Sequence, residues 1–238
     1  LKSSLDERER MLRRQEQLMY DLSHELRTPA TIARGHLELI HTPDESATAA
    51  SSIALDELAR IDRIVERLVL LARAERGRLV ELGEVETEQF LEDVLLRWSE
   101  IAERSWRLGA APPGLLRADP DALRIALDAL LENAVKYTDV GDAIELRARV
   151  DGTHIVVEVE DSGPGVPLGS ANRIFARSAR IEETEDRAGL GIGLAIVDAI
   201  ARAHGGTCTL EPSSPGSTFA LRLPGFRPTE QLVASSDL

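Results

Sequence analysis

The sequence predicts an α+β chain in two parts, an amino-terminal antiparallel helical hairpin followed by an α/β sandwich with a mixed sheet. Two patterns carry this prediction. Apolar residues recur at helical spacing through the first third of the chain, and beyond residue 79 helical periodicity alternates with period-two, strand-like segments. Of the 238 residues, 43% are apolar and 29% are charged, which is typical of a folded globular protein rather than a disordered one.

The helical hairpin is predicted from two apolar stripes joined by a turn-forming segment at residues 41–46. The first stripe comprises Leu5, Leu12, Met19 and Leu26, and the second comprises Leu58, Ile61, Val65, Leu68 and Ala72. Two helices cannot enclose a core by themselves. We therefore expect the hairpin to dimerise into a four-helix bundle.

The α/β part shows helical periodicity over residues 87–104, 120–137 and 194–204, and strand alternation over 144–150, 155–159 and 219–223. Asp151-Gly152 between two alternating runs predicts a hairpin, and Gly205-Gly206 predicts the end of a helix. These patterns divide the chain into a helical hairpin (1–76), an α/β sandwich (77–228) and a flexible tail (229–238).

Composition excludes several classes of function. The net charge of −13 argues against binding to the phosphate backbone of nucleic acids, which needs a basic surface. The single cysteine, Cys208, excludes an internal disulfide and a thiolate zinc site. No uncharged run approaches the ~20 residues that cross a bilayer, so we expect no direct membrane contact from this chain. Residue 1 is Leu, and a helical pattern is already under way there, so we expect a cytosolic fragment of a longer protein.

The first chemical site is the string Ser23-His24-Glu25-Leu26-Arg27-Thr28-Pro29. If Met19 and Leu26 occupy heptad position a, His24 falls at f and faces away from the seam, with Thr28 one turn further along the same face. Pro29 should bend the helix beside His24. An imidazole with one free nitrogen is a nucleophile toward phosphorus, and Glu25 is the adjacent proton acceptor. The alternative reading is an idle surface histidine.

The second chemical site is predicted from three segments of the α/β part. Asp161-Ser-Gly163-Pro-Gly165 places a carboxylate at a strand end, where it can accept a hydrogen bond from an exocyclic amine. Gly189-Leu-Gly191-Ile-Gly193 precedes a helix whose N-terminus favours phosphate oxygens. On the 120–137 helix, the Asn133 carboxamide suits Mg²⁺ and the Lys136 ammonium suits a phosphate. Each segment alone also fits a simple turn, helix–sheet packing or a solvated helix face. Together and in this order they favour a nucleotide site.

The string from Ser23 to Pro29 resembles the phosphoacceptor box of the sensor histidine kinases of two-component systems. This resemblance implies that His24 is the phosphorylated residue and that Glu25 is its general base. It also implies that Thr28 orients a water molecule when the protein dephosphorylates its partner.

The three α/β segments resemble the ATP-binding domain shared by histidine kinases, type II topoisomerases, mismatch-repair ATPases and a heat-shock chaperone. The resemblance implies ATP and Mg²⁺ as ligands, with Asn133 binding the metal. It assigns the other contacts as follows: Lys136 to a phosphate, Tyr137 to a wall of the adenine site, Asp161 to the adenine amine, Gly163 and Gly165 to the shape of that wall, Gly189, Gly191 and Gly193 to the hinge of a lid, and Thr218 to the last motif, Gly216-Ser-Thr218-Phe219.

Two positions depart from the family pattern. Many members carry an additional asparagine four residues before the metal-binding one, where this chain has Ala129; Asp128 and Glu132 are the neighbours that could compensate. The lid stretch Ile174-Phe175-Ala-Arg177-Ser178 has the first of two frequent phenylalanines and Ser178 at the place of the second. Arg177, Arg180 and Arg187 are candidate contacts to the γ-phosphate.

We therefore expect a homodimeric protein-histidine kinase that phosphorylates His24 from ATP, passes the phosphoryl group to an aspartate of a response regulator receiver domain, and dephosphorylates that regulator. The resemblance implies that the parent is a bacterial inner-membrane sensor whose present portion faces the cytoplasm. One alternative is an ATP hydrolase of the topoisomerase or chaperone kind, although those relatives place a water-activating glutamate at the position of Ala129. The other is a phosphatase or docking scaffold with nucleotide as a conformational ligand. His36, His41, His154 and His204 share no ligand spacing and are expected at the surface or as helix caps.

Overall fold

The computed structural model describes residues 26–37, 50–55, 57–58, 61–65, 80–166, 174–175, 193–213 and 215–229. The chain divides into two compact units, Leu1–Val69 and Leu70–Leu238. The predicted junction at residues 76 and 77 and the tail beyond residue 229 lie outside the described residues. Within these ranges, no helix combines the length and the apolar character needed to cross a membrane.

In the first unit, the described residues are helical, and they include Leu26 of the first predicted stripe and Leu58, Ile61 and Val65 of the second. The other stripe residues lie outside the described residues. Pro29, Ala33, Ala54 and Ile64 are buried. Larger apolar side chains of the same segments are exposed in this single chain: Ile32, Leu37, Ile53, Leu55, Leu58 and Val65. These exposed side chains give the described helices of the first unit an apolar surface.

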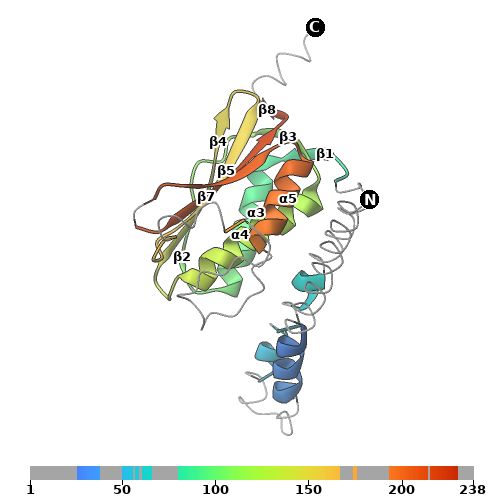
Figure 1. Cartoon of the computed structure of the whole chain (residues 1–238), viewed down its shortest axis with the longest axis vertical. Coiled ribbons are helices and arrows are strands. Elements are labelled where there is room, and N and C mark those ends of the chain that lie inside the picture. Colours follow the sequence, from blue (N-terminus) through green and yellow to red (C-terminus); the bar gives the residue numbers. More distant parts are fainter. Residues whose placement is uncertain are drawn as a thin grey trace, which may run out of the picture. The chain divides into compact units, whose positions relative to one another are not determined.

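The described residues of the second unit form two sheets and three helices (Figure 1). The elements follow in the order β1 (Gly83–Glu86), α3 (Thr87–Ile101), β2 (Ser105–Leu108), β3 (Gly114–Ala118), α4 (Pro120–Tyr137), β4 (Ala143–Asp151), β5 (His154–Asp161), α5 (Gly193–Ala203), β6 (Thr207–Glu211), β7 (Ser217–Pro224) and β8 (Phe226–Pro228). The larger sheet has the order β2-β4-β5-β7-β6. Its β2–β4 pair is parallel and the other pairs are antiparallel, so the predicted mixed sheet is confirmed.

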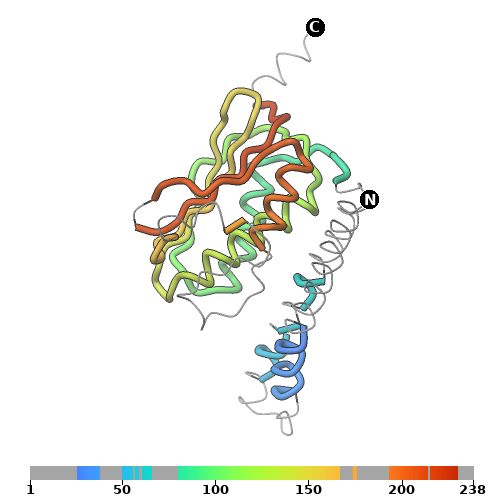
Figure 2. Tube along the Cα trace, in the orientation of Figure 1, coloured from blue at the N-terminus to red at the C-terminus, as the bar shows by residue number. Residues whose placement is uncertain are grey.

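The three helices lie on one face of the five-stranded sheet, as the chain trace shows (Figure 2). Alternate residues of the three central strands are directed to that face and are buried there: Ile144, Leu146, Ala148, Ile155, Val157, Val159, Phe219, Leu221 and Leu223. Period-two alternation selects this set because neighbouring strand residues point to opposite faces. The core therefore lies between the sheet and α4, whose Leu127, Leu130 and Leu131 are fully buried.

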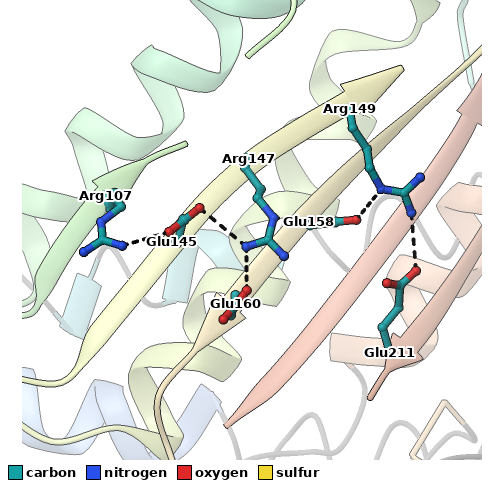
Figure 3. Close-up of polar contacts among 7 residues, drawn as sticks. All are labelled: Arg107, Glu145, Arg147, Arg149, Glu158, Glu160 and Glu211. Atoms are coloured by element: carbon teal, nitrogen blue, oxygen red, sulfur yellow. Dashed lines mark hydrogen bonds and ion pairs between the residues drawn. The ribbon is translucent and has the colours of Figure 1, made fainter. Parts of the chain in front are cut away.

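The opposite face of the same sheet carries a ladder of ion pairs (Figure 3). Glu158 on β5 accepts hydrogen bonds from the Nε atoms of Arg147, at 2.6 Å, and Arg149, at 2.8 Å. Arg147 also contacts Glu160 at 2.5 Å through Nη1. The long arginine side chains explain why Glu158 is only 4% exposed on a face that no helix covers in the described part of the chain.

Helix boundaries follow from local chemistry. Asp119 caps α4 by accepting hydrogen bonds from the backbone N–H groups of Asp121 and Ala122 at 3.0 Å, and Pro120 occupies the first turn. Helix α5 ends as predicted, because Gly205 adopts φ +74° and the Gly206 N–H bonds back to the Ala201 carbonyl at 2.8 Å.

Helix α3 is shorter than the predicted 87–104 segment. It ends at Ile101, where Ala102 leaves the helix with extended backbone angles. The Trp106 indole N–H donates to the Ala102 carbonyl at 2.8 Å and so stabilises the bend that follows the helix. Arg104 consequently lies in the loop before β2 rather than on the helix.

Asp119 also connects the start of the second unit to α5. Its Oδ2 atom accepts from the backbone N–H of Glu81 at 2.7 Å, and its own N–H donates to Nε2 of His204 at 3.0 Å. His204 Nδ1 lies 2.8 Å from the carbonyl of Ile200, an arrangement that requires the neutral Nδ1–H tautomer. The expected capping role of His204 is confirmed, but this side chain is buried rather than at the surface.

Candidate functional site

The candidate site is built around Asp161, the last residue of β5. Its carboxylate is 3% exposed, and Oδ1 accepts a hydrogen bond from the Gly163 N–H at 3.0 Å. Burial raises the pKa of Asp161 above its usual value, although hydrogen bonds from the backbone N–H groups of Gly163 and Ser217 oppose the shift. The turn thus holds a desolvated carboxyl group whose remaining acceptor capacity is available to a ligand.

Three glycines allow the backbone to close around Asp161. A Cβ atom on Gly163 would lie 2.5 Å from the Tyr137 carbonyl oxygen and 2.9 Å from Asp161 Oδ1. Gly165, at φ +77°, and Gly216, at φ +101°, pack against each other. A Cβ on Gly165 would come within 2.8 Å of the Gly216 carbonyl oxygen. Larger residues would push the β5 and β7 ends apart, so the predicted roles of Gly163 and Gly165 as shape-determining residues fit this geometry.

The last two turns of α4 lie against this glycine-lined turn. They carry Asn133, Lys136 and Tyr137, which are all half-buried. The Lys136 ammonium lies 5.3 Å from the centroid of the Tyr137 ring. The side chain of Asn133 makes no hydrogen bond with any residue that the structure describes, which leaves its carboxamide oxygen available to a metal ion.

Ala129 lies on α4 near the start of α5. It is 3% exposed on α4, and a Cβ on Gly193, the first residue of α5, would stand 3.8 Å from the Ala129 Cβ. Asp128 does not take the place of a missing ligand, because its Oδ1 accepts from the Trp98 indole N–H at 2.8 Å and from Arg97 on α3. Asp128 therefore joins α3 to α4 instead of facing Gly193.

Part of the predicted lid is described. Ile174 is buried, and the Phe175 ring meets the Phe219 ring of β7 edge to face, with centroids 6.3 Å apart. The phenylalanine that the sequence retains is thus packed on the core. Other predicted lid residues lie outside the described residues: Gly189, Gly191, Arg177, Ser178, Arg180 and Arg187.

The structure does not bring Thr218 to the Asp161 turn. In the β5–β7 register, Asp161 pairs with Ser217, whereas Thr218 pairs with Glu160 and points to the outer face of the sheet. Directly paired residues of antiparallel strands share a face, so Ser217 is the hydroxyl residue beside Asp161. A sequence signal for this existed. Phe219 belongs to the core-facing alternation of its strand, and Ser217, two residues earlier, must share that face, whereas Thr218 must not.

In the first unit, Thr28 is exposed on the described helical segment 26–37. Pro29 is buried on the same segment, and Thr31 Oγ1 donates to the Arg27 carbonyl at 2.8 Å. His24 and Glu25 lie outside the described residues.

The residues of the second unit fit a purine nucleotide with one divalent cation. A buried carboxylate at a strand end suits an exocyclic amine, and Asn133 and Lys136 follow on the adjacent helix. Among the described residues, no group of three or more His, Cys, Asp or Glu side chains could enclose a metal. Mg²⁺ is generally held by one or two protein oxygens together with phosphate oxygens and water, and the Asn133 carboxamide is a donor of that kind.

Two family models match separate parts of the chain. The model described as "His Kinase A (phospho-acceptor) domain" matches residues 14–77. The model described as "Histidine kinase-, DNA gyrase B-, and HSP90-like ATPase" matches residues 118–226. The first range includes His24 and Thr28, and the second includes every predicted nucleotide contact.

Two curated relatives align with most of the chain, and one solved structure aligns with its larger part. The chain is 39% identical over 226 residues to the "Probable sensor histidine kinase TcrY" of Mycobacterium tuberculosis, covering 90% of this chain and 47% of that protein. It is 30% identical over 235 residues to the "Signal transduction histidine-protein kinase/phosphatase MprB" of Mycobacterium sp. strain KMS, covering 89% and 44%. The solved ATP-binding domain of PrrB from M. tuberculosis superposes with a TM-score of 0.51 at 29% identity, covering 60% of this chain and 97% of that domain. The chain spans about half the length of the curated relatives it matches.

Proposed function

Because the chain belongs to the sensor histidine kinases of bacterial two-component systems, we propose that it is the portion that binds ATP, phosphorylates its own His24 and passes the phosphoryl group to a response regulator. The observation that carries the proposal is the buried Asp161 carboxylate in a glycine-lined turn against the Lys136–Tyr137 end of α4. It provides the recognition element for the purine, and the phosphoacceptor match supplies the second half of the reaction.

Nucleotide binding assigns one role to each residue of the second unit. The Asp161 carboxylate accepts a hydrogen bond from the adenine amine, Ser217 lies beside it, and Tyr137 forms a wall of the adenine site. Lys136 contacts a phosphate, and Gly189, Gly191 and Gly193 act as the lid hinge. Asn133 is the protein ligand of Mg²⁺, which when bound neutralises charge on the phosphate oxygens.

In the kinase reaction, an imidazole nitrogen of His24 attacks the γ-phosphorus, the bond from that phosphorus to the bridging oxygen breaks, and ADP leaves. The Nδ1 or Nε2 proton opposite the new bond is held by Glu25, which acts as the general base. A carboxylate oxygen of the receiver aspartate then attacks the same phosphorus and releases His24. Most of the catalytic effect in such reactions is positioning and charge neutralisation.

We further propose that the protein is a homodimer that also removes the phosphoryl group from the regulator. The exposed Ile32, Leu55 and Val65 support dimerisation, because a second hairpin would cover them. Thr28 is exposed on its helix, and we propose that its hydroxyl orients the attacking water. The name of MprB includes both kinase and phosphatase. We also propose that the chain lies on the cytoplasmic side of an inner-membrane sensor.

Incubation of the chain with γ-labelled ATP and Mg²⁺ tests the proposal. The protein should acquire acid-labile, base-stable label, His24→Ala should lose it, and Thr31→Ala, one turn beyond the site, should keep it. Persistent labelling of His24→Ala would overturn the assignment of the phosphoacceptor. Steady ATP turnover with no phosphoprotein would favour the hydrolase alternative, and dephosphorylation of a regulator without self-labelling would favour the phosphatase scaffold.

A further inference from the structure

We propose that Arg104, in the loop between α3 and β2, is a positioning residue that holds the C-terminal turn of α4 in the geometry that binds nucleotide. This inference rests on the proposed nucleotide site. Arg104 is not one of the predicted nucleotide contacts. It acts indirectly, by holding the backbone that carries Lys136 and Tyr137.

The C-terminal end of α4 has no glycine at the position where one commonly terminates a helix. Thr138, at the C-cap, has extended backbone angles and no glycine directly follows it, so the glycine-based arrangement that ends α5 is absent here. The carbonyl groups of the last helical turn therefore need donors from elsewhere.

Arg104 supplies those donors. Its Nη2 atom donates to the Thr138 carbonyl at 2.9 Å and to the Val135 carbonyl at 3.2 Å, and its Nε atom donates to Thr138 Oγ1 at 2.9 Å. The Thr138 hydroxyl in turn donates to the Ala134 carbonyl at 2.8 Å. A cation at a helix C-terminus is also electrostatically favourable, and the planar guanidinium can serve several acceptors at once.

The loop that presents Arg104 is itself held at both ends. The Trp106 indole N–H donates to the Ala102 carbonyl at 2.8 Å, and the Ser105 N–H donates to the Asp142 carbonyl at 2.8 Å. These bonds hold the loop backbone on both sides of Arg104, so the main entropy cost of its contact with α4 is the ordering of the arginine side chain.

The turn that Arg104 holds adjoins the Asp161 site directly. The Tyr137 carbonyl oxygen lies so close to Gly163 that a Cβ there would approach it to 2.5 Å. The Gly163 N–H in turn donates to the Asp161 carboxylate. A shift of the last turn of α4 therefore moves a wall of the adenine site and the phosphate-facing Lys136 together.

The test compares the full chain with Arg104→Ala, Arg104→Gln and Arg104→Lys in calorimetric titrations with Mg-ADP. Arg107→Ala is the matched control, because Arg107 is a nearby, exposed arginine whose ion pair with Glu145 lies on the outer sheet face. We expect the dissociation constant to rise about tenfold in Arg104→Ala and Arg104→Gln, less in Arg104→Lys, and by under about twofold in Arg107→Ala. Lysine restores the charge but cannot bridge all three acceptors.

Two further readouts separate positioning from general stability. Hydrogen exchange in Arg104→Ala should rise at residues 135–138 and 163 while the central strands stay protected. In autophosphorylation, KM for ATP should rise about tenfold while kcat at saturating ATP stays within about twofold, because bound nucleotide restores the turn. If Arg104→Ala does not fold, Arg104→Lys and Thr138→Val are expected to show intermediate losses of affinity. Thr138→Val removes the hydroxyl that accepts from Arg104 Nε and donates to the Ala134 carbonyl, and it keeps the Thr138 backbone carbonyl as an acceptor.

The outcomes are distinguishable. Failure of the wild-type chain to bind Mg-ADP would overturn the proposed function and this inference with it. If the wild-type chain binds Mg-ADP and Arg104→Ala binds it with unchanged affinity, this inference alone is overturned. If Arg104→Ala is unfolded, unchanged affinity in both Arg104→Lys and Thr138→Val has the same consequence. Exchange that rises throughout the sandwich, or an equal loss in Arg107→Ala, would also overturn it.

Discussion

Gly216 packs so tightly on Asp161 that a Cβ atom on the glycine would overlap the Asp161 carbonyl oxygen. Gly216 precedes β7, and Asp161 ends β5, so this contact closes the end of the central strand pair where the candidate nucleotide site lies. The chemistry of the site therefore depends on a backbone approach that only glycine permits.

We expect Gly216→Ala to lower the free energy of unfolding by about 3 kcal/mol or more, because it adds a steric overlap to the strain of a positive φ. Nucleotide binding should be lost as well. Gly141→Ala is a matched control, since Gly141 has φ +92° but open space around its Cβ position. It should cost only about 1–2 kcal/mol. Equal costs in urea denaturation would show that the close approach is unimportant.

Asp161→Asn should weaken Mg-ADP binding at least about tenfold. An asparagine that accepts from the Gly163 and Ser217 N–H groups would present its own NH₂ to the adenine amine, so that two donors face each other. Calorimetric titration measures this, with Asp121→Asn at the exposed start of α4 as the control. Unchanged affinity would remove Asp161 from the adenine site.

The same variant tests the pKa of Asp161, which burial raises above its usual value. As the pH falls, the folded protein takes up a proton on Asp161 before the unfolded chain does. The ionised carboxyl therefore opposes folding at neutral pH, and this cost becomes smaller as the pH falls toward the usual aspartate range. Without nucleotide, Asp161→Asn should be as stable as wild type or more stable at pH 7. Relative to the variant, wild type should gain stability as the pH falls from neutral, through the raised pKa of Asp161, toward the usual aspartate value. A variant less stable than wild type at pH 7 would contradict the desolvation argument.

Ala129→Asn should destabilise the nucleotide-free chain by about 1–3 kcal/mol, because it places a carboxamide that needs hydrogen-bond partners at a 3% exposed position beside Gly193. If the position faces the metal and phosphates, Mg-ADP should supply those partners and raise the melting temperature more in Ala129→Asn than in wild type. Ala126→Asn, fully buried in the core, should be destabilised without this recovery. An equal nucleotide-induced shift in wild type and Ala129→Asn would place residue 129 away from the ligand.

Glu158→Gln should lower stability at pH 7 by about 1–3 kcal/mol, since two guanidinium groups lose their charged partner. Burial raises the pKa of Glu158, but hydrogen bonds and charges of Arg149 and Arg147 outweigh it and hold the pKa below its usual value. This contribution is present above the usual glutamate range and is lost as the pH falls through the lowered pKa. Denaturant titrations from pH 7 to pH 3 should therefore converge for wild type and Glu158→Gln. The more exposed Glu160→Gln should show a smaller difference throughout.

Much of this architecture was predictable because it depends on patterns within single segments. The α4 helix was predicted at its observed bounds, since Asp119 and Pro120 mark its start and apolar periodicity runs to Tyr137. The β4–β5 hairpin was also predicted, although its two turn residues are Gly152 and Thr153. Strands β1, β2, β3, β6 and β8 were not predicted, because each has three to five residues of which at most three are apolar, and so short and sparse a run gives a weak strand signal.

Residue order along the chain was sufficient for the kinds of element present, for the glycine turn at Asp161 and for the two family resemblances, because periodicity and short motifs are local properties. Which hydroxyl lies beside Asp161, Ser217 rather than Thr218, depends on the β5–β7 register. That Asp128 bonds to α3 and that Arg104 caps α4 depends on contacts between residues about 30 positions apart. Such contacts are decided when the helices and the sheet pack together, because burial and hydrogen-bond geometry, and not sequence spacing, select each partner.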